Sequence, residues 1–84
     1  MIHVLYFARL REELNCDQED IAMNPNLSTI EDLLTLLRSR GTPWSDSLAE
    51  SKRLMFAINQ EVSPITATFS DNDEIALFPP VTGG

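Results

Sequence analysis

An 84-residue chain with 43% apolar and 23% charged residues is sized for one small globular domain and is too short to enclose a deep active site. Thirteen acidic residues against six basic ones give a formal net charge of -7, which repels nucleic-acid phosphates and anionic lipid headgroups. We therefore expect neither nucleic acid nor a membrane as a partner. The acidity favours docking on a basic protein surface instead.

Cysteine and histidine content limits the possible site chemistry. Cys16 is the only cysteine, so the chain cannot form an internal disulfide or a multi-cysteine metal site, and a reducing, cytoplasmic location fits best. No His or Lys lies near Cys16 in the sequence to activate the thiol, and His3 is the only histidine. We assign neither residue a role, and we expect no metal and no permanently bound cofactor.

The N-terminal segment, residues 2–8, predicts a central strand because it is short, rich in β-branched and aromatic residues, and stopped by charges. Both faces of this strand carry bulky apolar groups, although a strand with one solvated face would alternate with polar residues. We therefore expect one of the two apolar faces to contact a partner. The two faces consist of Ile2, Val4 and Tyr6 on one side and His3, Leu5 and Phe7 on the other.

Residues 9–14 predict a helical turn, and residues 17–23 contain a weak second strand. The strongest signal begins at Ser28, which with Glu31 has the spacing of a capping box. The main helix follows and ends at Gly41. Its apolar positions recur at i, i+3, i+4 and i+7, namely Ile30, Leu33, Leu34 and Leu37.

The second half predicts another short helical turn at residues 44–50, a third strand at 54–59, a turn at 59–61, a weak edge segment at 62–68 and a last strand at 74–78. This order predicts an α+β fold in which a mixed sheet packs on one main helix. The first and last strands are the most apolar, so we expect them to be neighbours at the sheet centre. We expect one domain over residues 1–78 and a tail over 79–84.

The predicted tail consists of Pro79, Pro80, Val81, Thr82, Gly83 and Gly84. Two prolines favour an extended exit from the last strand, and two glycines leave no Cβ beside the terminal carboxylate, so the tail can thread a narrow active site. For Gly-Gly alone, a frayed terminus is the alternative. The preceding strand and the Pro-Pro spacer favour a working tail whose chemical group is the Gly84 carboxylate.

Several segments together resemble the small subunits of molybdopterin synthase, a family of sulfur carriers. The resemblance rests on residues 2–12, on Ala57-Ile58-Asn59-Gln60, on Asp71-Asn72-Asp73-Glu74 and above all on residues 78–84. It covers essentially the whole chain, and the Phe-Pro-Pro-Val-Thr spacer is its most specific element. It implies a single-domain β-grasp, ubiquitin-like fold.

The resemblance also implies a reaction cycle. An activating enzyme uses ATP to adenylate Gly84, a sulfurtransferase system converts the adenylate to a thiocarboxylate, and the carrier docks on the large synthase subunit. There it donates sulfur to a cyclic pyranopterin monophosphate, and two transfers form the molybdopterin dithiolene. Catalytic side chains are expected on the large subunit, in a heterotetramer of two large and two small subunits.

By resemblance, Phe7, Val62 and Phe78 are expected to form an apolar interface with the large subunit. From periodicity alone, burial of both phenylalanines in the core is the alternative. Three other functions remain open: a sulfur carrier for thiamine biosynthesis, a ubiquitin-like protein modifier, and a binding module with an incidental Gly-Gly end. A modifier would use the same adenylation and the same tail, so only the spacer and the N-terminal resemblance favour the molybdopterin carrier over it.

Overall fold

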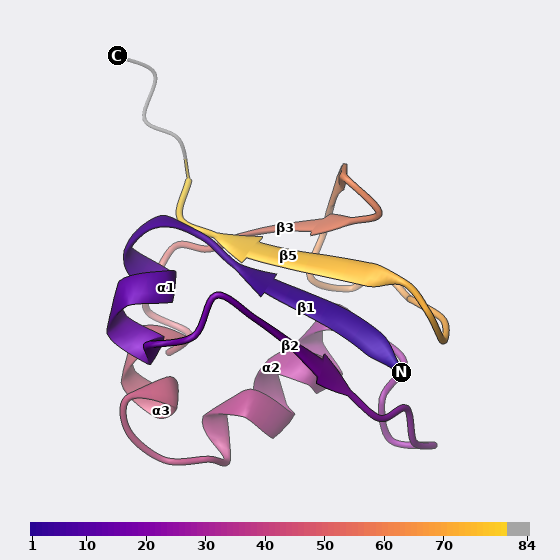
Figure 1. Cartoon of the computed structure of the whole chain (residues 1–84), viewed down its shortest axis with the longest axis horizontal. Helices are drawn as coiled ribbons and strands as arrows, with labels where there is room; N and C mark the ends of the chain where they lie inside the picture. Colours follow the sequence, from indigo (N-terminus) through magenta and orange to yellow (C-terminus); the bar gives the residue numbers. More distant parts are fainter. Residues whose placement is uncertain (81–84) are drawn as a thin grey trace.

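A computed structural model describes residues 1–80 of the chain. One mixed sheet holds five strands in the order β2-β1-β5-β3-β4 (Figure 1). Only β1 and β5, at its centre, are parallel, with Tyr6 opposite Leu77; this confirms the predicted pairing of the first and last strands. The strands are β1 (Ile2–Tyr6), β2 (Gln18–Ile21), β3 (Met55–Ile58), β4 (Glu61–Ser63) and β5 (Glu74–Phe78).

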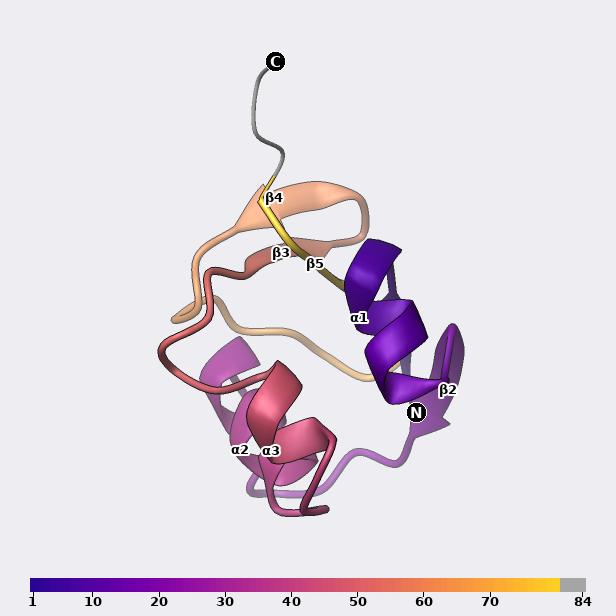
Figure 2. The same ribbon diagram turned by 90° about the vertical axis from the view of Figure 1, so that its left-hand side faces the viewer.

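Three helices accompany the sheet: α1 (Ala8–Leu14), α2 (Ile30–Arg38) and α3 (Trp44–Ser47). Figure 2 shows α2 and α3 on the same side of the sheet, while α1 lies beside the end of β5. The predicted α+β fold with one main helix is therefore confirmed. None of the three helices reaches the length and apolarity that crossing a bilayer requires.

The hydrophobic core lies between α2 and the face of the sheet that it covers. The side chains of Ile2, Val4 and Tyr6 are at most 1% exposed, which identifies the inner face of β1. The predicted apolar stripe of α2 packs against them, and all four of its members are buried. Strand β5 contributes Ile75 and Leu77.

The capping box of α2 lies one residue later than predicted. The hydroxyl of Thr29, not that of Ser28, accepts the backbone N–H of Asp32 at 3.2 Å, and the Asp32 carboxylate accepts the Thr29 N–H at 3.0 Å. The register is shifted because the backbone of Ile30 donates to Ala67 at 3.1 Å, which ties the start of the helix to the segment before β5. Ser28 also donates to the Asp32 carboxylate.

Several other boundaries differ from the predictions. Helix α2 ends at Arg38 and not at Gly41, because Arg40 and Gly41 donate to carbonyls three residues back. Helix α3 ends at Ser47 and not at residue 50.

Strand β1 ends at Tyr6 because Phe7 is the N-cap of α1. The predicted turn at 59–61 is a two-residue turn, in which Asn59 and Gln60 have φ of 51° and 71°, and Glu61 already belongs to β4. Positive φ at both positions suits the twist of a tight hairpin, so β4 pairs directly with β3.

A polar cluster borders the core between β1, β2 and the segment after α2. The Arg40 guanidinium donates two hydrogen bonds of 2.8 Å to the Glu19 carboxylate, which also accepts the Tyr6 hydroxyl at 2.7 Å. Arg40 lies 4.5 Å from the ring centre of Trp44, and that ring meets Tyr6 edge-on. Burial and the bond to Glu19 raise the pKa of Tyr6, so the hydroxyl stays a donor.

We predict that Glu19→Gln lowers the unfolding free energy at pH 7 by about 1 kcal/mol, because the variant loses a bidentate ion pair that is partly shielded from water. Hydrogen bonds from Arg40 and Tyr6 lower the pKa of Glu19 below its ordinary 4.5. Its stabilisation is therefore complete above that value and is lost as the pH falls through the lowered pKa.

Urea unfolding of both proteins at pH 7 and pH 3 measures this effect. The two curves should differ at pH 7 and converge at pH 3, while Glu12→Gln on the exposed surface of α1 should match the parent chain at both. An equal difference between parent and Glu19→Gln at the two pH values would refute the electrostatic origin.

Candidate functional site: the outer sheet face and the end of strand β5

The predicted tail begins where β5 ends. Pro79 and Pro80 follow Phe78 directly and are half-buried, so the exit of the chain from the sheet belongs to the described structure. The predicted active group, the Gly84 carboxylate, and the tail residues Val81, Thr82 and Gly83 lie outside the described residues. The site that can be built from the structure is therefore the surface from which the tail departs.

The face of the sheet opposite the core is apolar along its middle. Strand alternation and register place Leu5, Ala76, Ala57 and Val62 in one row across β1, β5, β3 and β4. Phe78 pairs with Met55 in the next row. We call this surface the outer apolar face; it comprises Leu5, Phe7, Met55, Ala57, Val62, Ala76 and Phe78.

Phe7 and Phe78 lie together at one end of the outer apolar face. Parallel pairing sets Tyr6 opposite Leu77, so the next residues on the two strands are neighbours, and the Phe7 amide donates to the Leu77 carbonyl at 3.2 Å. Phe7 is 44% exposed and Phe78 is half-buried. Neither residue belongs to the core, so the alternative drawn from periodicity is wrong.

Val62 is separated from the two phenylalanines. It lies on the edge strand β4, paired with Ala57, and it is 65% exposed. Two alanines, Ala57 and Ala76, lie between Val62 and Leu5 in the same row. The face thus has small side chains at its centre and larger ones around it, a shape that can receive protruding side chains of a partner.

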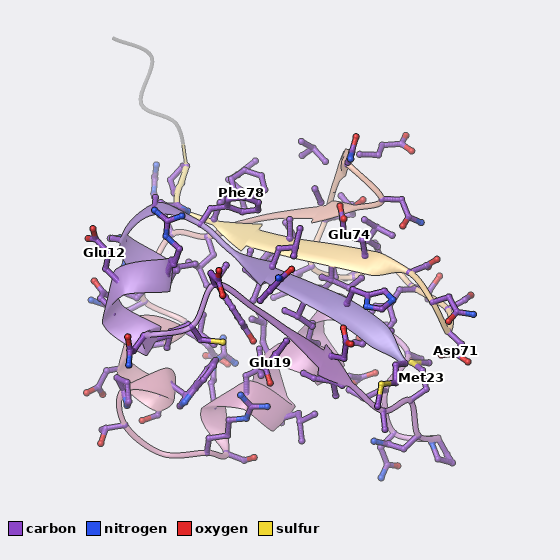
Figure 3. All side chains as sticks on the ribbon, viewed as in Figure 1. Glu12, Glu19, Met23, Asp71, Glu74 and Phe78 are labelled. Carbon is purple, nitrogen blue, oxygen red and sulfur yellow. The ribbon has the colours of Figure 1, made fainter. Side chains whose placement is uncertain are left out.

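Charge is segregated along the same face. Figure 3 shows Phe78 where β5 ends, with Glu74 and Asp71 toward the opposite end of the strand. There the imidazole Nδ1 of His3 lies 2.5 Å from the Asp20 carboxylate, and the N-terminal ammonium pairs with Asp71. A partner that covers the apolar end therefore avoids desolvating these charges.

The sequence and its family resemblance predict Phe7, Val62 and Phe78 as members of this face but do not predict Met55, Ala57 and Ala76. Those three residues lie in segments that are apolar on both faces, so their own pattern does not show which side they occupy. Apolar residues on both faces of β3 and β5 were the signal that could have revealed them.

The remaining reactive side chains show no arrangement for catalysis. The Cys16 thiol is half-buried, and burial together with the nearby Glu19 carboxylate raises its pKa, which disfavours the nucleophilic thiolate. Within residues 1–80, no three His, Cys, Asp or Glu side chains are grouped so that they could hold a metal ion. Arg11 lies on the exposed surface of α1.

Comparisons with known proteins identify the family of this chain. The molybdopterin synthase sulfur carrier subunit of Haemophilus influenzae is 39% identical to this chain, and that of Escherichia coli is 37% identical, each over the full length of both chains. Both relatives carry the name of the family that residues 78–84 resemble. The resemblance is therefore confirmed.

Solved structures show the same fold. A putative molybdopterin converting factor subunit 1 from Pyrococcus furiosus superposes with a TM-score of 0.76 at 24% identity, covering 95% of this chain and 97% of that one. A chain from the complex of subunits 1 and 2 of the Helicobacter pylori molybdopterin-converting factor superposes with a TM-score of 0.66 at 21% identity. The match covers 99% of this chain and 97% of that one. The model of the ThiS family matches residues 4–84, and the chain therefore belongs to the ThiS family.

Proposed function

We propose that this chain is a sulfur carrier of molybdenum cofactor biosynthesis and acts as the small subunit of molybdopterin synthase. The observation that carries the proposal is the full-length match to two sulfur carrier subunits of that synthase, at 39% and 37% identity. The fold contributes what such a carrier needs: a compact body, an apolar docking face, and a chain end that leaves the sheet beside that face.

The chemistry takes place at the Gly84 carboxylate. A carboxylate oxygen attacks the α-phosphorus of ATP on an activating enzyme, and pyrophosphate leaves, which produces an acyl-adenylate. Hydrosulfide supplied by a sulfurtransferase system then attacks the acyl carbon, AMP leaves, and loss of the proton from sulfur gives a terminal thiocarboxylate. Glycine at the last two positions suits both steps because no side chain crowds the reacting carbonyl.

Sulfur transfer follows on the synthase. The thiocarboxylate sulfur attacks a carbon of the cyclic pyranopterin monophosphate that carries an oxygen substituent, and the carbon–oxygen bond breaks as that oxygen leaves. Water then cleaves the acyl–sulfur bond, which releases the carrier carboxylate and leaves the sulfur on the pterin. Two such transfers supply the two sulfurs of the dithiolene. In this proposal the carrier body positions the chain end, and the catalytic side chains belong to the large subunit.

The outer apolar face is the proposed contact with the large subunit, and Phe7, Val62 and Phe78 are its predicted members. Support comes from the exposure of Phe7 and Val62 and from the position of Phe78 immediately before the tail. A partner bound there buries apolar surface and at the same time receives the chain end. The Helicobacter pylori neighbour was itself solved as a complex of subunits 1 and 2.

The curated relatives favour the molybdopterin pathway over a thiamine carrier and over a protein modifier, because both carry the same name at full-length coverage. The heterotetramer and the cytoplasmic location stay predictions of the family resemblance and of the cysteine content.

We predict that deleting Gly84 abolishes sulfur loading and leaves the thermal unfolding midpoint within about 1 °C, since an end beyond the last strand contributes little to stability. Intact mass after incubation with the activating enzyme, ATP and a sulfur source measures loading. The parent chain should gain about 16 Da as sulfur replaces oxygen at the carboxylate. A sulfur gain in the deletion variant would disprove the assignment of Gly84.

We predict that Phe78→Asp and Phe7→Asp each weaken binding to the large subunit by roughly tenfold or more, because an unpaired carboxylate would be buried at an apolar contact. Titration calorimetry with the purified large subunit measures the affinity, and circular dichroism checks the fold.

Leu36→Asp is the matched control, because Leu36 is an exposed apolar residue of α2 on the opposite side of the sheet. The control should bind like the parent chain. Unchanged affinity of a folded Phe7→Asp variant would exclude the outer apolar face as the interface.

A further inference from the structure

A second surface lies on the α2 side of the sheet and meets the outer apolar face at Met55. It is a pocket of about 480 Å³ between α2, the segment before β3 and the segment after β4. Leu34, Leu54 and Ile65 contribute apolar walls, and Pro80 lies at its margin. An adjoining hollow of about 490 Å³ shares Leu54 and Ile65 with it. That hollow has no basic residue in its lining and includes Val62 of the outer apolar face, so we call only the first pocket the basic groove.

The basic groove concentrates the positive charge of an acidic chain. Its lining includes Arg38, Lys52 and Arg53, which are half of the six basic residues, together with only Glu31 and Glu50 among the acidic ones. Outside the groove lining, the chain has three basic and eleven acidic residues. The local sign of charge is therefore opposite to that of the whole molecule.

Within residues 1–80 the three groove cations form no ion pair, although the pKa of Glu13 is lowered by the hydrogen bond from Ser47 and in smaller part by the charge of Lys52. The ion pairs found within residues 1–80 involve the N-terminus, His3, Arg9 and Arg40, and none involves a groove cation. Arg38 is held at the rim because its Nε donates to the Leu48 carbonyl at 2.6 Å. Unpaired cations beside apolar walls match a segment in which carboxylates alternate with apolar side chains.

The position of the groove relates its occupant to tail chemistry. Pro80 lines it, so a segment bound there lies beside the residue from which the tail departs. Met55 lines both hollows and also belongs to the outer apolar face, where it pairs with Phe78. The groove therefore continues the proposed synthase contact around the edge of the sheet.

We propose that the basic groove binds an acidic, apolar-containing segment of the enzyme that adenylates the tail; this inference rests on the proposed function. A carrier must leave this enzyme after each activation. A charged contact suits such a short encounter because charge complementarity raises the association rate and is weakened by salt, whereas the apolar face suits the more lasting synthase complex.

The test is ATP–pyrophosphate exchange catalysed by the purified activating enzyme of the same organism, with the full chain as substrate at 50 and 300 mM salt. The variant Lys52→Gln/Arg53→Gln removes two exposed groove charges with little change of shape. We expect its KM for the carrier to rise about tenfold at low salt, with kcat unchanged. The salt dependence of KM seen with the parent chain should largely vanish.

The matched control is Asn26→Asp/Gln60→Glu, which changes the net charge equally at two exposed positions outside the groove. The KM of the control variant should stay within about twofold of the parent value. The affinity of the groove variant for the large subunit should also stay within about twofold of the parent affinity. Equal KM values for the two variants would overturn the inference, and so would an equal loss of large-subunit affinity in the groove variant.

Other occupants predict different results. If the chain's own end occupied the groove, the groove variant would be activated at a lower KM than the parent chain. If a second copy occupied it, sedimentation would show a parent dimer that the variant lacks. Either outcome overturns the inference while leaving the proposed function intact. Failure of the parent chain to support any exchange would instead overturn the proposed function, and the inference with it.

Discussion

The parallel pairing of β1 with β5 is the constraint on which the rest of the structure depends. It joins residues separated by about seventy positions, sets Tyr6 opposite Leu77, and thereby brings Phe7 next to Phe78. The same pairing makes β5 a central strand, flanked by β1 and β3, so the point from which the tail departs is anchored on both sides. A long-range contact of this kind is costly in chain entropy, and the buried apolar residues of both strands offset that cost.

A rigid departure point matters for a carrier whose reactive group is in the main chain. The contribution of the body to the proposed chemistry is to present the chain end in a defined direction, from a strand paired on both sides. The end of β5 does this beside two surfaces of different character. The outer apolar face offers buried area, and the basic groove offers charge in an otherwise acidic molecule.

These surfaces suit a protein that must visit more than one enzyme. Apolar contacts give complexes that dissociate slowly, whereas charged contacts mainly accelerate association and weaken with salt. Met55 belongs to both surfaces, so partners that use them would meet at the edge of β3. Two large partners could then not bind at the same time, so the carrier would have to leave one before it binds the other.

Local patterns in the sequence determined most of the elements, because strand and helix periodicities depend on neighbouring residues alone. Residues 74–78 predicted β5 with its observed bounds, and the apolar spacing from Ile30 to Leu37 predicted α2. The assignment of the Gly84 carboxylate as the reactive group also rests on sequence, through the tail and its family resemblance, and it stays a prediction. Tertiary structure decided the rest. The capping box moved to Thr29 because a contact with Ala67, far along the chain, set the start of the helix.

The docking surfaces were beyond sequence reasoning for the same physical reason. Which face of a doubly apolar strand is buried depends on where α2 packs, so Met55 and Ala76 were recognisable as outer residues only in the folded sheet. The basic groove joins Arg38 of α2 to Lys52 and Arg53, which precede β3. Their shared position arises from the packing of α2 against the sheet and from no local pattern.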